Sequence, residues 1–97
     1  MKNTQYIKSM LSNALPVLKQ KYPVQSIALF GSHARGEQKS KSDIDILVEL
    51  NGEMDWNYFD LCYEIQALLP EEKVDVVSKG AIQENYWKFI KDDLIYA

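Results

Sequence analysis

The sequence predicts a small α/β (α+β) domain in which helices pack on a β-sheet, and three observations support this fold class. Apolar residues recur at helical spacing in three separate segments. Short apolar runs indicate strands between the helices. In one run apolar residues alternate with other residues, and another is rich in β-branched residues. Prolines and glycines stand at the borders of these segments. Taken in order, the segments give α-β-β-α-β-α, a small sandwich of helices on a sheet.

The first helix is expected over residues 4–22, and proline shapes both its middle and its end. Pro16 interrupts the apolar pattern. With Asn13 as a cap, Pro16 would fall in the first turn of a second helical piece, where its missing N–H does little harm. Pro23 then ends the helix. The apolar residues that recur at helical spacing are Ile7, Met10, Leu11, Ala14, Leu15 and Leu18.

Three strands are predicted after this helix. Residues 24–30 form a buried run bounded by Pro23 and Gly31, and residues 73–78 form the third strand. Residues 43–50 alternate, so their side chains divide between two faces. One face carries Ile44, Ile46, Val48 and Leu50, and the other carries Asp43, Asp45, Leu47 and Glu49.

Two further helices and an edge strand complete the prediction. Asp55 is the expected cap of a helix over residues 55–69, which Pro70 ends. Residues 81–92 form the last helix, and residues 94–96 a short edge strand. The apolar stripe of the middle helix is Tyr58, Leu61, Cys62, Ile65, Leu68 and Leu69. Core packing is expected for most of the aromatic residues Trp56, Tyr58, Phe59, Tyr86 and Trp87, and a partner surface for some of them.

Length and composition limit the classes of function. The 97 residues are expected to form one domain, residues 1–97. A net charge of -3 and a pI of about 5.0 disfavour nucleic acid as the main partner, because nucleic-acid binders usually carry a basic face. The single cysteine, Cys62, excludes an intrachain disulfide and favours the reducing cytoplasm. No apolar run is long enough to span a membrane.

Two acids at the start of the second strand carry the strongest chemical signal. Asp43 and Asp45 are two residues apart on an extended chain, so both carboxylates leave the same face. Their Cα atoms are expected to lie roughly 6.5–7 Å apart, a spacing that suits two divalent ions about 4 Å apart. Two carboxylates so close repel each other, and a cation relieves that repulsion. Oxygen ligands favour Mg²⁺. The alternative is an ordinary acid pair in a strand-start turn.

Asp75 is the candidate for a third carboxylate. It stands between Val74 and Val76 in the third predicted strand. An acid in such an apolar run is unexpected, because burying an unpaired charge costs free energy. A third carboxylate would complete the metal site and could take the proton of an attacking hydroxyl. The alternative is an edge or strand-end acid that faces water.

A phosphate site is predicted in the polar loop of residues 31–42. Gly31 allows the backbone to approach a phosphate closely, and Ser32 offers a hydroxyl and an N–H. A helical turn after Ser32 would add free N–H groups for an anion. Arg35 is placed to meet phosphate or a partner protein, and Gly36 allows the loop to bend out of the turn. The alternative is a strand-to-loop turn with a solvated arginine. For His33, an ordinary loop histidine is favoured over a substrate contact.

The pattern of Gly31-Ser32, ten residues and then Asp43-x-Asp45 resembles the signature of polymerase-beta-like nucleotidyltransferases. The string GSHARGEQKSKSDIDILVEL, residues 31–50, resembles in particular the minimal nucleotidyltransferase (MNT) group. Members of that group are commonly encoded beside HEPN-domain proteins, as antitoxins of HEPN–MNT toxin–antitoxin pairs. The string VDVVS, residues 74–78, is a weaker match to the family's third-acid strand. Only residues 31–50 are specific, although the element order agrees over nearly the whole chain.

The resemblance implies a mixed sheet with helices on one side and a nucleotidyl-transfer reaction. It implies that Gly31 and Ser32 hold the triphosphate of ATP and that two Mg²⁺ ions bridge it to Asp43 and Asp45, with Asp75 assisting. The acceptor would be a side-chain hydroxyl, a tyrosine, of a partner HEPN toxin. Larger relatives append a helical domain that holds the acceptor. The sequence shows no such domain, so an acceptor from outside is expected.

Two other functions stay open from the sequence. The chain could be a catalytically inert antitoxin that neutralises its partner by binding alone. It could also be a nucleotidyltransferase that acts on a small molecule, although the missing acceptor domain counts against this. Incubation of the chain with labelled ATP, magnesium and the partner protein would discriminate these two functions from protein adenylylation.

Overall fold

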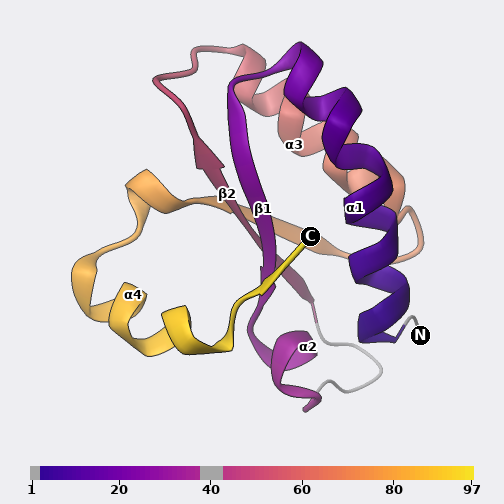
Figure 1. Cartoon of the computed structure of the whole chain (residues 1–97), viewed down its shortest axis with the longest axis vertical. Coiled ribbons are helices and arrows are strands. Elements are labelled where there is room, and N and C mark those ends of the chain that lie inside the picture. Colours follow the sequence, from indigo (N-terminus) through magenta and orange to yellow (C-terminus); the bar gives the residue numbers. More distant parts are fainter. Residues whose placement is uncertain (1–2, 38–42) are drawn as a thin grey trace.

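The computed structural model describes residues 3–37 and 43–97, and these residues follow the predicted order of elements (Figure 1). The remainder of the predicted 31–42 loop, residues 38–42, lies outside the described residues. The longer elements are α1 (Thr4–Lys21), β1 (Val24–Phe30), α2 (Ser32–Arg35), β2 (Ile44–Leu50), α3 (Asn57–Leu68), β3 (Val74–Ser78), α4 (Glu84–Ile90) and β4 (Ile95–Tyr96). Two 3₁₀ turns, η1 (Lys79–Ala81) and η2 (Lys91–Asp93), flank α4.

The strands of the described residues form one mixed sheet in the order β3-β2-β1-β4. β1 runs antiparallel to both β2 and β4, whereas β2 and β3 are parallel. A parallel pair needs a long crossover connection, and α3 lies in the one between β2 and β3. The predicted edge strand is confirmed, because Ile95 and Tyr96 pair with Leu29 and Ala28 of β1.

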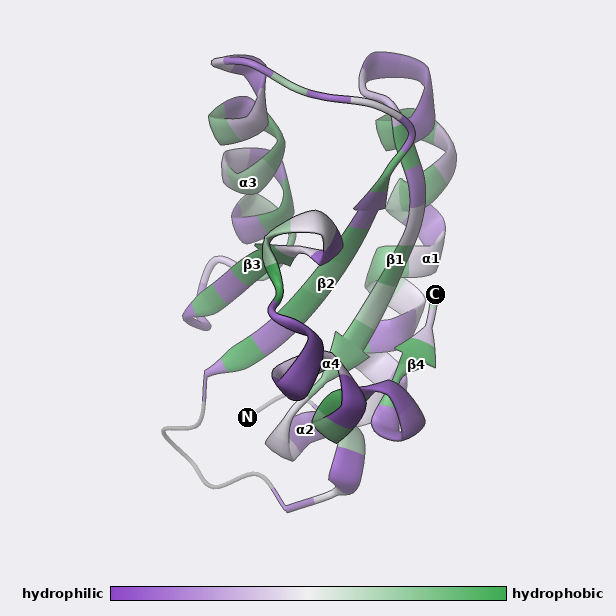
Figure 2. Ribbon diagram, turned by 90° about the vertical axis from the view of Figure 1, so that its left-hand side faces the viewer, coloured by the Kyte–Doolittle hydropathy of each residue, from purple (hydrophilic) through white to green (hydrophobic). Residues whose placement is uncertain are grey.

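One face of the sheet is buried beneath α1 and α3 (Figure 1). The alternation predicted for β2 is confirmed, because Ile44, Ile46 and Val48 all lie in this core. Figure 2 shows the hydrophobic stretches of β1 and β2 running between the helices. Burying one large aliphatic side chain contributes roughly 1.5–3 kcal/mol, so this layer fixes the strands that carry the acids. The other core members are Ile7, Leu11, Leu18, Val24, Ile27, Leu29, Leu61, Ile65 and Leu69.

The opposite face is partly covered by α4. The resemblance implied helices on one side only, and this expectation is wrong, because the sheet separates α1 and α3 from α4 (Figure 1). Phe30 and Leu47 point to this second face and need a cover, which Ile90 of α4 provides. Asp45 lies on the same face as Leu47, two residues before it on β2. The acids therefore share a face with this second, smaller core.

α1 is one helix, and the predicted restart at Asn13 is wrong. Asn3 is the N-cap, and its side chain accepts a hydrogen bond from the Tyr6 N–H at 2.7 Å. Pro16 lies inside the helix. An interior proline costs about 3 kcal/mol. Leu11 before it and Leu18 after it are buried in the same core, and this burial offsets the cost.

α3 and α4 both begin later than predicted. Trp56, not Asp55, occupies the N-cap of α3, and it makes no side-chain capping bond. Trp56 already has helical backbone angles. The backbone carbonyl of Asp55 therefore accepts a hydrogen bond from the Tyr58 N–H, at 3.1 Å, in the first turn. The predicted 81–92 helix keeps only Glu84–Ile90 as α-helix, with 3₁₀ turns near its two ends.

Several aromatic side chains expected in the core are exposed. The exposed fractions are 83% for Trp56, 65% for Phe59 and 49% for Tyr86, whereas Tyr58 and Trp87 pack against the two cores. Helical spacing alone did not separate the inner from the outer aromatic residues of α3 and α4. No helix of residues 3–37 and 43–97 is long and apolar enough to cross a membrane.

α1 and α3 are joined at the surface by Glu64. Its carboxylate pairs with Lys21 at 2.8 Å and accepts a hydrogen bond from the hydroxyl of Tyr22. The hydrogen bond from Lys21, followed by that from Tyr22, lowers the pKa of Glu64, and the same carboxylate raises the pKa of Tyr22 to about 12.

Glu64→Gln is expected to reduce the free energy of unfolding by at most about 1 kcal/mol at pH 7, because the pair is solvent-screened. A lowered carboxyl pKa stabilises the fold above the unfolded pKa, and this contribution is lost as the pH falls through the folded pKa. Urea unfolding at pH 7 and pH 3 checks this, with exposed Glu53→Gln as the control. An equal loss at both pH values would contradict the expectation.

Candidate active site

The register of the sheet brings two of the predicted acids side by side. Asp45 of β2 pairs directly with Asp75 of β3 in the parallel ladder. Directly paired residues of neighbouring strands point to the same face, and the strands are about 4.8 Å apart. Asp43 immediately precedes β2, two residues before Asp45. The fold therefore brings together the three acids that the sequence singled out.

The surroundings of Asp45 disfavour the ionised form of its carboxylate and raise its pKa. Burial is the largest influence that raises its pKa, followed by the charges of Asp75 and Asp43. His33 and Arg35 act in the opposite direction and lower it. The two neighbouring acids are thus close enough to Asp45 to disfavour its ionised form. A divalent cation at this point would reverse that balance.

The carboxylates do not form a closed metal cage in this conformation. Oδ2 of Asp43 lies 3.6 Å from Nζ of Lys73, and Asp75 is exposed. Among the described residues, no three His, Cys, Asp or Glu side chains converge closely enough to hold a metal ion. The donor set nevertheless fits Mg²⁺, because it consists of carboxylate oxygens and this ion usually retains several waters. A cation bound by Asp43 would compete with Lys73 for this carboxylate.

Gly31 is needed for a reason that the sequence did not reveal. Its backbone has φ 76° and ψ −153°, a region that essentially only glycine occupies. A Cβ added at this position would collide with the Asp45 carboxylate. Gly31 therefore leaves room for the Asp45 side chain, in addition to its predicted role in phosphate approach.

A short helical turn follows Gly31, as the sequence allowed. α2 begins at Ser32, and Gly36 closes it with φ 71°, the left-handed conformation that lets the chain leave the turn. The N–H of Arg35 donates to the carbonyl of Gly31 at 3.2 Å. Gly31 therefore connects the end of β1 to this turn next to Asp45, and Ser32 is the first residue of the turn.

Arg35 is held by two acids. Its Nε lies 2.9 Å from Oε1 of Glu37, and its Nη1 lies 3.8 Å from Oδ2 of Asp93 in the turn after α4. It is also close enough to lower the pKa of Asp45. Its guanidinium thus sits at the border of the acid site, where a phosphate would compete with Glu37 and Asp93.

His33 is a buried structural link, which its place in a polar loop did not indicate. It is fully buried, so the favoured interpretation as an ordinary loop histidine is wrong. Its Nδ1 lies 3.2 Å from the carbonyl oxygen of Asp43, and its own carbonyl accepts from the Thr4 hydroxyl at 2.7 Å. His33 therefore joins α1, α2 and the start of β2. A lone histidine in a polar loop gives no signal of this role, because the contacts are remote in sequence.

His33→Ala is expected to lower the free energy of unfolding by about 2–4 kcal/mol, since it removes a buried ring and a partner of the Asp43 carbonyl. Thr4→Val removes only the hydroxyl that binds the His33 carbonyl and should cost about 1 kcal/mol. Chemical denaturation of both variants checks the order. A loss for His33→Ala no larger than that for Thr4→Val would contradict the assigned role.

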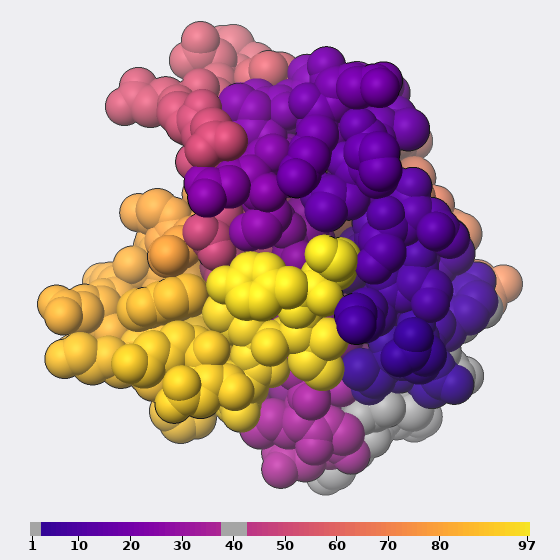
Figure 3. Space-filling view, viewed as in Figure 1, coloured from indigo at the N-terminus to yellow at the C-terminus, as the bar shows by residue number. Residues whose placement is uncertain are grey.

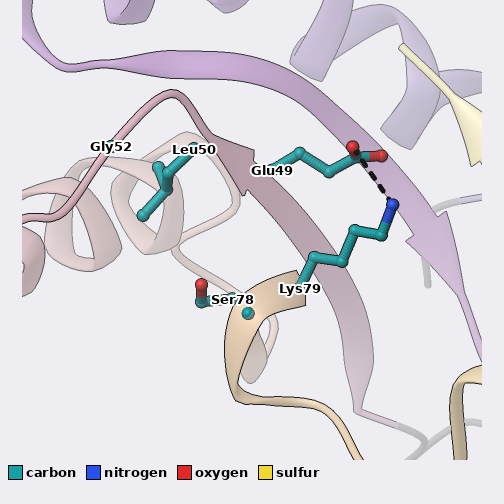
Figure 4. A pocket seen from close by; sticks show the side chains of 6 residues that line it. Glu49, Leu50, Gly52, Ser78 and Lys79 are labelled. Carbon is teal, nitrogen blue, oxygen red and sulfur yellow. Dashed lines mark ion pairs between the residues drawn. The ribbon is translucent and has the colours of Figure 1, made fainter. Parts of the chain in front are cut away.

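A pocket opens farther along the same face, near the ends of β2 and β3. It measures about 320 Å³ and is lined by Glu49, Leu50, Gly52, Ser78, Lys79 and Gly80. Figure 4 shows Lys79 reaching across to Glu49, and their charged atoms lie 3.5 Å apart. The hollow is visible in Figure 3 between the segments around residues 52 and 80. It includes none of the six predicted site residues, so the acid site lies outside this pocket.

Comparison with known proteins identifies the family of this chain. The chain fits the model of the nucleotidyltransferase domain family over residues 11–97, and it belongs to that family. It is 50% identical to a predicted protein adenylyltransferase of Methanocaldococcus jannaschii over 98 residues, 99% of each chain. It is 32% identical to the protein adenylyltransferase MntA of Thermococcus cleftensis over 91 residues, 93% of this chain and 91% of that one.

Solved structures share the fold. A structure of a predicted minimal nucleotidyltransferase superposes with a TM-score of 0.78 at 23% identity, covering 97% of this chain and 95% of that one. The complex of a tri-AMPylated HEPN toxin of Shewanella oneidensis with its MNT antitoxin gives 0.65 at 21% identity, covering 93% and 70%. A toxin–antitoxin structure with AMP-PNP gives 0.56 at 29% identity, covering 84% and 61%.

Proposed function

We propose that this protein is a Mg²⁺-dependent protein adenylyltransferase, which moves AMP from ATP to a side-chain hydroxyl of a partner HEPN toxin and so acts as its antitoxin. One observation carries the proposal. The direct pairing of Asp45 with Asp75, with Asp43 two residues away, places three carboxylates beside the Gly31-Ser32 turn. Carboxylate oxygens are the ligands that Mg²⁺ prefers, so these residues support the proposal of a metal-bound triphosphate.

Each residue has a distinct task in this reaction. The backbone at Gly31 and the N–H and hydroxyl of Ser32 bind the triphosphate. Asp43, Asp45 and Asp75 hold the magnesium, which neutralises phosphate charge when bound. Arg35 exchanges its contacts with Glu37 and Asp93 for a phosphate oxygen.

The transfer itself makes one bond and breaks one. The acceptor hydroxyl oxygen attacks the α-phosphorus, and the bond from that phosphorus to the bridging oxygen of the β-phosphate breaks. Pyrophosphate leaves, and the hydroxyl proton passes to Asp75, which is the exposed acid of the three and therefore the one that an incoming side chain can reach.

The relatives support this choice of donor and acceptor. The two sequence relatives above are described as protein adenylyltransferases, and they align with almost all of this chain. The solved neighbours include an AMPylated HEPN toxin held by an MNT antitoxin and a toxin–antitoxin structure with an ATP analogue. A tyrosine acceptor, a single catalytic domain over residues 1–97 and a cytoplasmic location belong to the same proposal.

Co-expression with the protein encoded beside this chain, which the proposal expects to be a HEPN toxin, tests the proposal. The two proteins are expected to copurify, and the intact mass of the partner should rise by whole AMP units. Asp43→Asn with Asp45→Asn should leave the partner unmodified. A partner that stays unmodified yet is neutralised equally well by parent and variant would establish the contact-only function instead. AMP transfer to a small molecule, with none to the partner, would establish the third candidate.

A further inference from the structure

Two exposed aromatic side chains of α4 have no task in the chemistry described so far. Tyr86 is 49% exposed and Phe89 is 70% exposed. Their rings are nearly parallel, with an interplanar angle of 17° and centroids 6.5 Å apart. Both rings are therefore accessible to solvent, and they lie side by side on α4.

This aromatic pair lies beside the acid site. Phe30, the last residue of β1, pairs directly with Asp45 across the antiparallel ladder. The ring of Tyr86 packs edge-on against Phe30, with centroids 6.5 Å apart and planes at 79°. A single side chain, Phe30, thus separates Tyr86 from the strand position that carries Asp45.

Arg35 gives a second, independent connection. Its pKa is raised mainly by Glu37 and to a smaller extent by Asp93 and Tyr86, so the phenol of Tyr86 is near the guanidinium. Asp93, in the turn that follows α4, reaches the same guanidinium at 3.8 Å. The aromatic pair and the proposed phosphate residues therefore border one region of the surface.

Core packing does not explain the exposure of these two rings. α4 already buries Ile90, and Trp87 packs beside it in the second core. Phe89 forgoes most of the burial that a phenylalanine normally gains on folding. Exposed aromatic rings next to the proposed triphosphate site suit a nucleobase, because every base has a π-face that stacks on aromatic side chains.

We propose that Tyr86 and Phe89 form the platform on which the purine base of the nucleotide stacks. This inference rests on the proposed function, since it assigns the base-binding part of the same site. Phe30 fixes the Tyr86 ring from behind, and Phe89 extends the surface outward. Arg35 and the Gly31-Ser32 turn hold the phosphates at the other end of the nucleotide.

Two ligands separate base binding from phosphate binding. Calorimetry of the intact protein with Mg²⁺ should compare ATP, which has a base, with tripolyphosphate, which has none. The variants are Phe89→Ala and Tyr86→Leu, the latter keeping an apolar contact with Phe30 but not the ring. Phe59→Ala on α3 is the matched control, because it is an exposed phenylalanine on the other side of the sheet.

Each platform variant is expected to lower the affinity for ATP by about 5- to 100-fold, the range typical of one stacked base. Affinity for tripolyphosphate should stay at the parent value, and Phe59→Ala should change neither. Parental ATP affinity in both variants overturns the inference, and if transfer to the partner is nevertheless lost, the rings contact the partner instead. Equal losses for both ligands also overturn it. A parent that binds neither ligand refutes the proposed function itself.

Discussion

Asp45→Asn is expected to reduce AMP transfer by well over a hundredfold while making the metal-free protein slightly more stable. The activity falls because the variant loses the carboxylate at the centre of the three acids, and even indirect partners of a metal ligand typically contribute 10- to 100-fold. The stability rises because burial, Asp75 and Asp43 all disfavour the ionised carboxylate in the fold.

The direction of the stability change follows from proton binding. A raised pKa means that the native state holds an extra proton, so the metal-free parent loses stability as the pH rises through the pKa of Asp45. Asparagine has no such loss. Without metal, the melting temperature of the Asp45→Asn variant should exceed that of the parent. The difference should be a few degrees at most, because water screens a half-buried carboxylate.

Thermal melts with EDTA and with Mg²⁺ plus ATP check this pair of effects. Mg²⁺ and ATP should raise the melting temperature of the parent and leave that of Asp45→Asn unchanged, since a ligand stabilises only the state that binds it. Asp92→Asn, an exposed acid in the turn after α4, is the control and should behave like the parent. If Asp45→Asn melts below the parent in EDTA, the account of a repelled carboxylate is wrong.

Gly31→Val is expected to abolish transfer and to destabilise the fold. Two physical effects act together, because a branched side chain is forced into a backbone region reserved for glycine and its Cβ meets the Asp45 carboxylate. The strain alone costs on the order of 1–3 kcal/mol. The collision also displaces the Asp45 carboxylate from its position beside the other acids.

Gly36→Val is the matched comparison for this variant. Gly36 also has a positive φ of 71°, but a Cβ there meets nothing within 4 Å among the described residues. It should therefore lose stability while keeping most of the transfer activity. Ser32→Ala should reduce transfer only mildly, since the backbone N–H remains. Denaturation and transfer assays on the three variants give the order, and a Gly36→Val enzyme as inactive as Gly31→Val would contradict the assigned collision.

The sequence predicted most of the strands because their signals are local. Alternation in residues 43–50 located β2 and its two faces, and Pro23 and Gly31 marked the ends of β1. Asp75 could be picked out as an acid in a β-branched run. Its position beside Asp45 could not be derived, because the register of a parallel pair depends on the crossover through α3.

The features that escaped prediction depend on contacts remote in sequence. His33 is buried because Thr4 and Asp43 close around it, and nothing in the loop itself indicates this. Pro16 stays within one helix because residues on both sides of it share a core. α4 covers the second face because Phe30 and Leu47 need burial there. In each case tertiary packing overrode a local preference.

The most direct test of the central claim follows the phosphorus atoms of ATP into the partner protein. The purified complex should be given ATP labelled at the α-phosphate in one reaction and at the γ-phosphate in another, with Mg²⁺ present. The account predicts that the HEPN partner acquires the α-label alone, that the γ-label appears in pyrophosphate, and that Asp45→Asn transfers neither. Incorporation of the γ-label, or α-label transfer undiminished in Asp45→Asn, would contradict it.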